Sequence, residues 1–195
     1  MHSHRTQSVL LISFLLLLAA AAPARAQGFI SPLIGYDFGG NSGCPGISNC
    51  EDKRSNVVIA FGTMGAVFGF EEEFANARHF FGSVGDLSSS VITLMSNVMV
   101  VPAAGPVHPY VLGGLGLMKS HVDFTTADVL SATNNSLAWD LGGGVTILFA
   151  RHIGIRGDLR HFHSTKAITI PFVGSTVTDE KLTFNRASAA LVLAF

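Results

Sequence analysis

The segment WDLGGGVTILF, which runs from Trp139 to Phe149, has large apolar residues at alternate positions and mostly polar residues or glycine between them. The apolar positions are Trp139, Leu141, Val145, Ile147 and Phe149. The positions between them include Asp140, Gly142, Gly144 and Thr146. A period of two residues predicts a β-strand with one apolar face, because successive side chains of a strand point to opposite sides.

The same alternation recurs in other parts of the chain. In one segment Phe68, Phe70 and Phe74 oppose Gly69, Glu71 and Glu73. In a second, Ile153, Ile155 and Leu159 oppose Arg156, Asp158 and Arg160. In the last, Ala187, Ala189, Leu191, Leu193 and Phe195 oppose Arg186 and Ser188. Glu72 breaks the pattern because it falls among the phenylalanines, so we expect either an interfacial position or a bulge that shifts the register.

The pattern predicts eight strands, near 29–38, 56–65, 67–76, 90–101, 108–118, 137–149, 153–163 and 183–195. The connections alternate in length. The long ones lie near 39–55, 77–89, 119–136 and 164–182, and the short ones near 65–66, 102–106 and 150–152. Long loops on one side and short turns on the other are typical of outer-membrane barrels. At about 10 residues per membrane strand, eight strands fit, ten remain open, and a sixteen-stranded porin does not fit.

The N-terminus predicts export. A polar start with one charge, Arg5, precedes the apolar run 9–22, and Ala24 and Ala26 stand at the positions that signal peptidase requires. We therefore expect a signal peptide over 1–26, cleaved between Ala26 and Gln27, and one barrel domain over 27–195. A membrane anchor is the alternative, but the apolar run is short for a helix that spans a membrane.

The composition supports a barrel in a membrane. Only 13% of the residues are charged, 21 are glycine, and the mean hydropathy is +0.45, yet no segment after residue 26 has the pattern of a membrane helix. In lipid the other structure that satisfies every backbone polar group is a closed barrel. Without the basic residues of the signal peptide the net charge is about −3, which does not suggest a nucleic-acid partner.

The two cysteines, Cys44 and Cys50, lie in a turn-rich segment. Export places them in an oxidising compartment, which favours a disulfide within one loop. A metal site needs more ligands than these two residues supply, and the spacing is not that of a Cys-x-x-Cys redox pair.

Several motifs resemble the OmpA-type family of outer-membrane β-barrel domains over nearly the whole chain after residue 26. They are SNVMVV with Asn97, HPYVLGGLGL from His108 to Leu117, WDLGGGV from Trp139 to Val145, GIRGDLRHFH from Gly154 to His163, and the terminal LVLAF. The resemblance implies an all-β fold, a single antiparallel up-and-down transmembrane β-barrel, with long loops facing outside the bacterial outer membrane. The resemblance does not extend to the periplasmic peptidoglycan-binding domain of full-length family members, so we do not expect anchoring to the cell wall.

The resemblance also implies partners. Leu191, Leu193 and Phe195 look like the family's C-terminal assembly signal, which the barrel assembly machinery recognises. We expect a monomer in outer-membrane lipid, with no cofactor or metal and with an unidentified surface ligand as a further candidate partner through the long loops.

Seven charged residues have the parity of the barrel interior: Glu71, Glu73, Asp140, Arg156, Asp158, Arg160 and Arg186. Eight strands leave an interior just wide enough for side chains, so we expect ion pairs that plug the lumen. A narrow or gated channel is the alternative. The glycine clusters 113–116 and 142–144 continue into strand pattern, which favours close packing over a phosphate-binding loop.

The predicted function is a non-enzymatic outer-membrane protein with a structural or surface-interaction role. One alternative is a lipid-modifying barrel enzyme similar to lipid A deacylases, with His161, His163 and Ser164 as candidates; however, adjacent residues of one strand point to opposite sides. The other alternative, a soluble ligand-binding barrel, would invert the two faces.

Overall fold

The computed structural model describes residues 27–40, 42, 53–80, 87–102, 105–124, 131–172 and 175–195. At residues 87, 88, 122–124, 131–134, 167–172 and 175–180 only the backbone is described. The predicted signal peptide, Cys44 and Cys50 lie outside the described residues, so both the cleavage site and the disulfide stay predictions.

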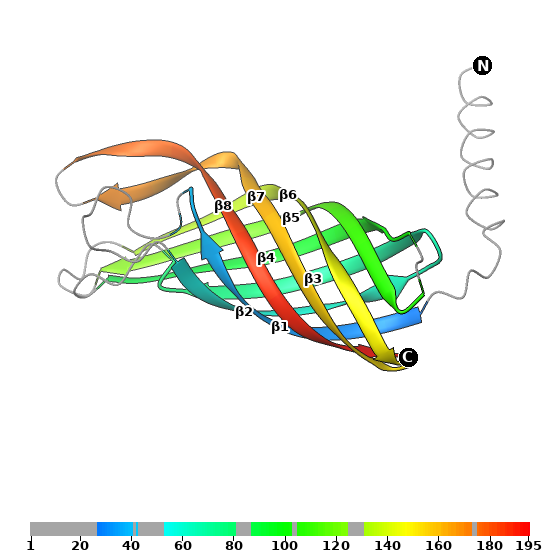
Figure 1. The fold of residues 1–195 in the computed structure, drawn as a ribbon. Coiled ribbons are helices and arrows are strands. Elements are labelled where there is room, and N and C mark those ends of the chain that lie inside the picture. The colour runs from blue at the N-terminus through cyan, green and yellow to red at the C-terminus, as the bar shows by residue number, and fades with distance from the viewer. Residues whose placement is uncertain are drawn as a thin grey trace, which may run out of the picture.

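Eight antiparallel strands form one closed barrel in which each strand pairs with its neighbours in the sequence and β8 pairs with β1 (Figure 1). The strands are β1 Gln27–Phe38, β2 Lys53–Met64, β3 Phe68–Arg78, β4 Leu87–Val100, β5 Val107–Phe124, β6 Ser131–Ala150, β7 Ile153–Phe172 and β8 Ser175–Ala194. The eight predicted strands are confirmed, and the alternative of ten strands is wrong. The described residues contain no helix long and apolar enough to span a membrane.

The strands are strongly tilted (Figure 1). A row of directly paired residues that starts at Phe38 and crosses every strand returns to β1 at Gly28, ten residues earlier in the chain. The row passes through Asn185, His161, Leu141, Gly113, Val98, Phe70 and Thr63. This stagger sets the tilt and the narrow diameter of the barrel.

Two of the predicted long loops, 119–136 and 164–182, are wrong over most of their length. β5 and β6 stay paired up to Asp123 and Ser131, and β7 and β8 stay paired up to Phe172 and Ser175. The two hairpins continue beyond the row where β8 leaves β1 (Figure 1). The residues 164–182 include many Thr, Ile and Val, which favour strands, but the same stretch holds Pro171 and Gly174, which obscure the pattern.

The outer wall of the barrel is apolar, as the alternation predicts. The two faces are sorted by parity throughout, and exposed Val, Leu, Ile and Phe side chains cover the outside. Glu72 also lies on the outside, within an uninterrupted register on both sides, so the bulge hypothesis is wrong. Ser96 on the neighbouring strand donates hydrogen bonds to both Glu72 carboxylate oxygens, at 2.7 and 2.9 Å, which partly compensates the carboxylate in an apolar wall.

The interior differs from the expected polar face because it is layered. One apolar cluster fills the loop end of the barrel and includes Phe80, Met95, Met118, Phe162 and Phe184. A second fills the short-turn end and includes Phe29, Met64, Met99, Tyr110 and Val192. Charged residues lie between the two. Side chains that are buried inside a narrow barrel pack as in a protein core, so apolar side chains are favoured there wherever no charge needs a partner.

The end of the chain closes the barrel. The Phe195 N–H donates to Gly28 O at 2.8 Å, and the Gly28 N–H donates to Phe195 O at 2.9 Å. A β-carbon at Gly28 would lie 2.6 Å from the Phe195 ring, so glycine leaves the space that this ring occupies. Leu191, Leu193 and Phe195 all face outward.

Candidate functional site

The structure brings all seven predicted luminal charges into one layer in the middle of the barrel, which we call the luminal network. Arg156, Asp158 and Arg160 come from β7, Glu71 and Glu73 from β3, Asp140 from β6 and Arg186 from β8. Strands β3 and β7 are separated by three strands in either direction, so their ion pairs cross the lumen. Every one of these side chains is buried.

Arg160 is the centre of the luminal network. Its guanidinium contacts Glu71 and Glu73 at 2.8 Å each, Asp158 at 3.1 Å and Asp140 at 3.6 Å. Its exposed fraction is 1%. A planar guanidinium suits this position because it presents five N–H donors in fixed directions.

Arg156 connects the charged layer to the apolar cluster at the short-turn end. It pairs with Glu71 across the lumen, and its Nη2 lies 2.8 Å from Asp158 Oδ2. Its Nε donates to the Tyr110 hydroxyl at 2.6 Å, and Tyr110 in turn donates to Asp158 at 3.0 Å. The Arg156 guanidinium carbon also lies 4.8 Å from the centre of the Tyr110 ring, a cation–π contact.

Arg186 connects the same layer to the loop end and reaches a residue that the sequence analysis missed, Asp37. Its Nε donates to Asp37 Oδ1 at 2.8 Å, and its Nη1 donates to Glu73 Oε1 at 2.9 Å. Its guanidinium carbon lies 4.7 Å from the centre of the Phe162 ring. The signal for Asp37 was its parity, which it shares with Ser31 and Leu33, but its place at the end of a strand made it resemble a loop residue.

Small and neutral residues complete the layer. When its amide group is oriented to suit its neighbours, Asn97 donates to Asp140 Oδ1 at 2.7 Å and accepts from Arg160 Nη1 at 3.1 Å. A β-carbon at Gly144 would lie 2.5 Å from the Tyr110 hydroxyl, and one at Gly114 would lie 1.9 Å from the side-chain amide of Asn97. These glycines therefore give the network its space, which agrees with the packing role expected for the glycine clusters.

With Asp37 included, the ion pairs described above join five carboxylates to three guanidinium groups. The carboxylates are Asp37, Glu71, Glu73, Asp140 and Asp158. Charges removed from water are tolerated only when they are paired and hydrogen-bonded, and here each guanidinium contacts at least two carboxylates. The arrangement joins opposite walls of the barrel across the lumen.

The candidate residues for lipid hydrolysis do not form a nucleophile–base pair. Ser164 is fully buried and faces inward, where its hydroxyl donates to Lys166 O and accepts from the Leu182 N–H. His163 faces outward, with its Nδ1 2.9 Å from Thr183 Oγ1. A serine nucleophile needs a base within hydrogen-bond reach, and these two side chains lie on opposite faces of the wall.

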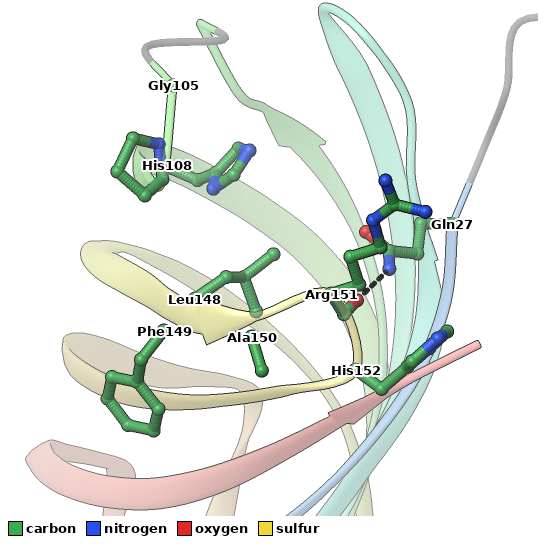
Figure 2. Close-up of a pocket in the computed structure, with 9 residues that line it drawn as sticks. Gln27, Gly105, His108, Leu148, Phe149, Ala150, Arg151 and His152 are labelled. Carbon is green, nitrogen blue, oxygen red and sulfur yellow. Dashed lines mark hydrogen bonds between the residues drawn. The ribbon is translucent and has the colours of Figure 1, made fainter.

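A hollow of about 580 Å³ lies at the short-turn end, between the β4–β5 and β6–β7 turns (Figure 2). His108, Leu148, Arg151 and His152 line it, and Gln27 closes one side by donating to Arg151 O at 2.7 Å. No carboxylate is among the described residues that line this hollow. Across the described residues, no three His, Cys, Asp or Glu side chains gather as ligands for a metal ion.

Comparison with known proteins agrees with this architecture. A family model described as "Outer membrane protein beta-barrel domain" matches residues 12–195. Neisserial surface protein A is 13% identical, with 86% of this chain and 97% of that chain covered and a TM-score of 0.64. The attachment invasion locus protein Ail of Yersinia pestis is 12% identical, with 87% and 99% covered and a TM-score of 0.57. A major outer membrane protein from Thermus thermophilus is 12% identical, with 86% and 99% covered and a TM-score of 0.51. The comparison with curated proteins finds no similar sequence.

Proposed function

The chain belongs to the outer membrane protein β-barrel domain family, and we propose that it is a non-enzymatic barrel with a plugged lumen and a structural or surface-interaction role. The observation that carries the proposal is the burial of Arg160 and Arg186, 1% and 0% exposed, among carboxylates from opposite walls. Side chains that fill an eight-stranded interior leave no room for a solute. The functional surfaces are then the outer wall and the two ends of the barrel.

The loop end is the better surface for a partner. The β5–β6 and β7–β8 hairpins extend beyond the closed part of the barrel, and in the described residues the segment 175–184 of β8 pairs with β7 alone. Unpaired strand edges can accept another chain, and loops on a rigid scaffold commonly carry recognition. In the proposed orientation this end faces outside the cell and the short turns face the periplasm. The barrel acts as a monomer, inserted by the barrel assembly machinery.

A trimmed variant tests the surface-interaction role. Ala167 and Lys181 are register partners, so an Asn-Gly turn can replace residues 168–180 and leave the closed barrel intact. Binding of the wild-type and trimmed proteins is measured against three candidate ligands: a sulfated glycan, a matrix protein and lipid vesicles. A sulfated compound is included because Ail has been crystallised with sucrose octasulfate, a heparin analogue. Trimming is expected to weaken binding to any ligand that the wild type binds by about tenfold or more. The control is Arg151→Ala, at the short-turn end. If the wild-type and trimmed proteins bind these ligands equally, or if neither protein binds any of them, the surface-interaction role is contradicted.

The enzymatic alternative has a separate test. Refolded protein incubated with phospholipid and with lipid A should release no fatty acid, because the Ser164 hydroxyl faces the lumen. Turnover that disappears in a His163→Ala variant with normal folding would contradict the non-enzymatic proposal.

A further inference from the structure

A group of polar and aromatic side chains interrupts the apolar outer wall across β6, β7 and β8, and we call it the imidazole cluster. The Trp139 ring centre lies 5.9 Å from that of His161 and 5.4 Å from that of His163. His161 Nδ1 lies 2.9 Å from Asn185 Oδ1, and His163 Nδ1 lies 2.9 Å from Thr183 Oγ1. The luminal network contains none of these five residues.

The imidazole cluster lies near the loop end of the apolar wall. Trp is typical of the interface between hydrocarbon and water in membrane barrels, and Trp139 is the only Trp of the chain. Lys181 is exposed on the same face of β8, two residues before Thr183 and nearer the loop end. The cluster and this cation are therefore at the depth of lipid headgroups.

Two apolar grooves lie next to this cluster, toward the middle of the barrel, and are neighbours because Leu159 of one is the register partner of Ala187 of the other. One has a volume of about 690 Å³ and runs over the small residues Gly157, Ala187 and Ala189, with Ile34 and Tyr36 among its walls. The other has a volume of about 500 Å³ and runs over Gly143, with Val111, Leu141 and Leu159 in its walls and His161 and Asn185 at its polar end. The hydrogen-bonded His161–Asn185 pair lines the second groove, and Asn185 stands two residues before Ala187 of the first groove on the same face of β8.

We propose that the imidazole cluster and its two grooves bind an anionic, phosphate-bearing lipid of the leaflet at the loop end. The grooves lie in a wall that faces the bilayer, so their occupants are acyl chains, and two grooves suit two chains of one lipid. An imidazolium donates from both ring nitrogens; with Nδ1 engaged by Asn185 or Thr183, Nε2 is left for an anionic oxygen. Among the described side chains of β6, β7, β8, β1 and β2, no carboxylate faces outward, so nothing described there repels a phosphate.

Fluorescence of Trp139 tests the proposal, because the ring of this single Trp is a neighbour of both imidazoles. The refolded barrel is placed in phosphatidylcholine vesicles in which a minor fraction of the lipid is brominated, either as phosphatidylcholine or as phosphatidylglycerol. Bromine quenches a Trp that it contacts. We expect the brominated phosphatidylglycerol to occupy the site about fivefold more readily than brominated phosphatidylcholine in the wild type.

Two variants separate a lipid site from ordinary interfacial residues. In His161→Gln/His163→Gln, which keeps hydrogen-bonding groups but removes the ionisable rings, the preference for the anionic lipid should disappear. Gly157→Leu fills one groove, and a side chain fits there because the nearest atom to a β-carbon is 3.9 Å away; it should also lower the preference. The control is Thr63→Leu, an outward-facing enlargement far from both grooves, and it should change nothing. Equal quenching by the two lipids in the wild type, or an unchanged preference in the Gln variant, overturns the proposal.

Discussion

Replacing Arg160 with leucine is expected to destabilise the barrel more than any single change on its outer wall. The guanidinium contacts four carboxylates, those of Glu71, Glu73, Asp140 and Asp158, at distances from 2.8 to 3.6 Å. With leucine, Glu73 keeps Arg186 and Glu71 keeps Arg156, but Asp140 loses the guanidinium with which it is paired. Removal of one partner from a buried ion pair typically costs about 3–5 kcal/mol, so we expect a loss of that size in the free energy of unfolding.

The measurement is a urea titration of the refolded protein in lipid vesicles, followed by the fluorescence of Trp139. The matched control is Arg78→Leu, because Arg78 is an exposed arginine on the outside of β3 and its loss should cost less than about 1 kcal/mol. Adding Asp140→Asn to Arg160→Leu should restore part of the stability, since Asp140 is paired with Arg160 and becomes an uncompensated charge in the single variant. If Arg160→Leu and Arg78→Leu have the same small effect, the luminal network does not hold the opposite walls together.

The chain ends and the cysteines give three further predictions. N-terminal sequencing of membrane-extracted protein should give Gln27 as the first residue, and an intact Met1 would contradict the predicted signal peptide. Mass spectrometry without reduction should show a two-hydrogen deficit from a Cys44–Cys50 bridge, whereas free thiols in protein isolated from the envelope would exclude it; the bridge should mainly restrict its own loop. Deletion of Phe195, which removes the closing pair with Gly28, should leave secretion intact but impair membrane insertion and abolish the heat-dependent gel shift. Leu193→Ala removes only outward-facing apolar surface, so it should still insert and lose at most about 1.5–3 kcal/mol, the range typical of one buried side chain; equal behaviour of the two proteins would remove the assembly role of Phe195.

The alternation of residues was sufficient to predict the eight strands and their faces, because a strand in a membrane wall must present apolar side chains outward at every second position. The same parity placed Glu71, Arg156, Arg160 and Arg186 in the lumen. The parity of a residue along its strand does not predict which charged side chains in the lumen form ion pairs with one another. The pairing of Arg186 with Asp37 depends on the closure between β8 and β1, which joins residues from the two ends of the barrel domain.

Other features needed the structure for specific physical reasons. The apolar layers inside the barrel share the parity of the charges, so the sequence does not distinguish them from residues of a polar channel. The β5–β6 and β7–β8 hairpins extend beyond the closed part of the barrel. There a lipid-facing surface no longer requires an apolar residue at every second position, so alternation does not predict the strands. The imidazole cluster combines Trp139 from β6 with His161 and His163 from β7, and only the register between these strands brings the three rings together.

A planar-bilayer recording tests the closed lumen most directly. Purified wild-type protein is predicted to show no large, steady, porin-like conductance, because we propose that the luminal network and the buried apolar clusters plug the interior. Arg186→Ser, which opens the layer between β8, β1 and β3, should raise any residual leak, and the five carboxylates of the network should make that leak selective for cations. A steady porin-like conductance from the wild type would contradict the account of a barrel that its own side chains close.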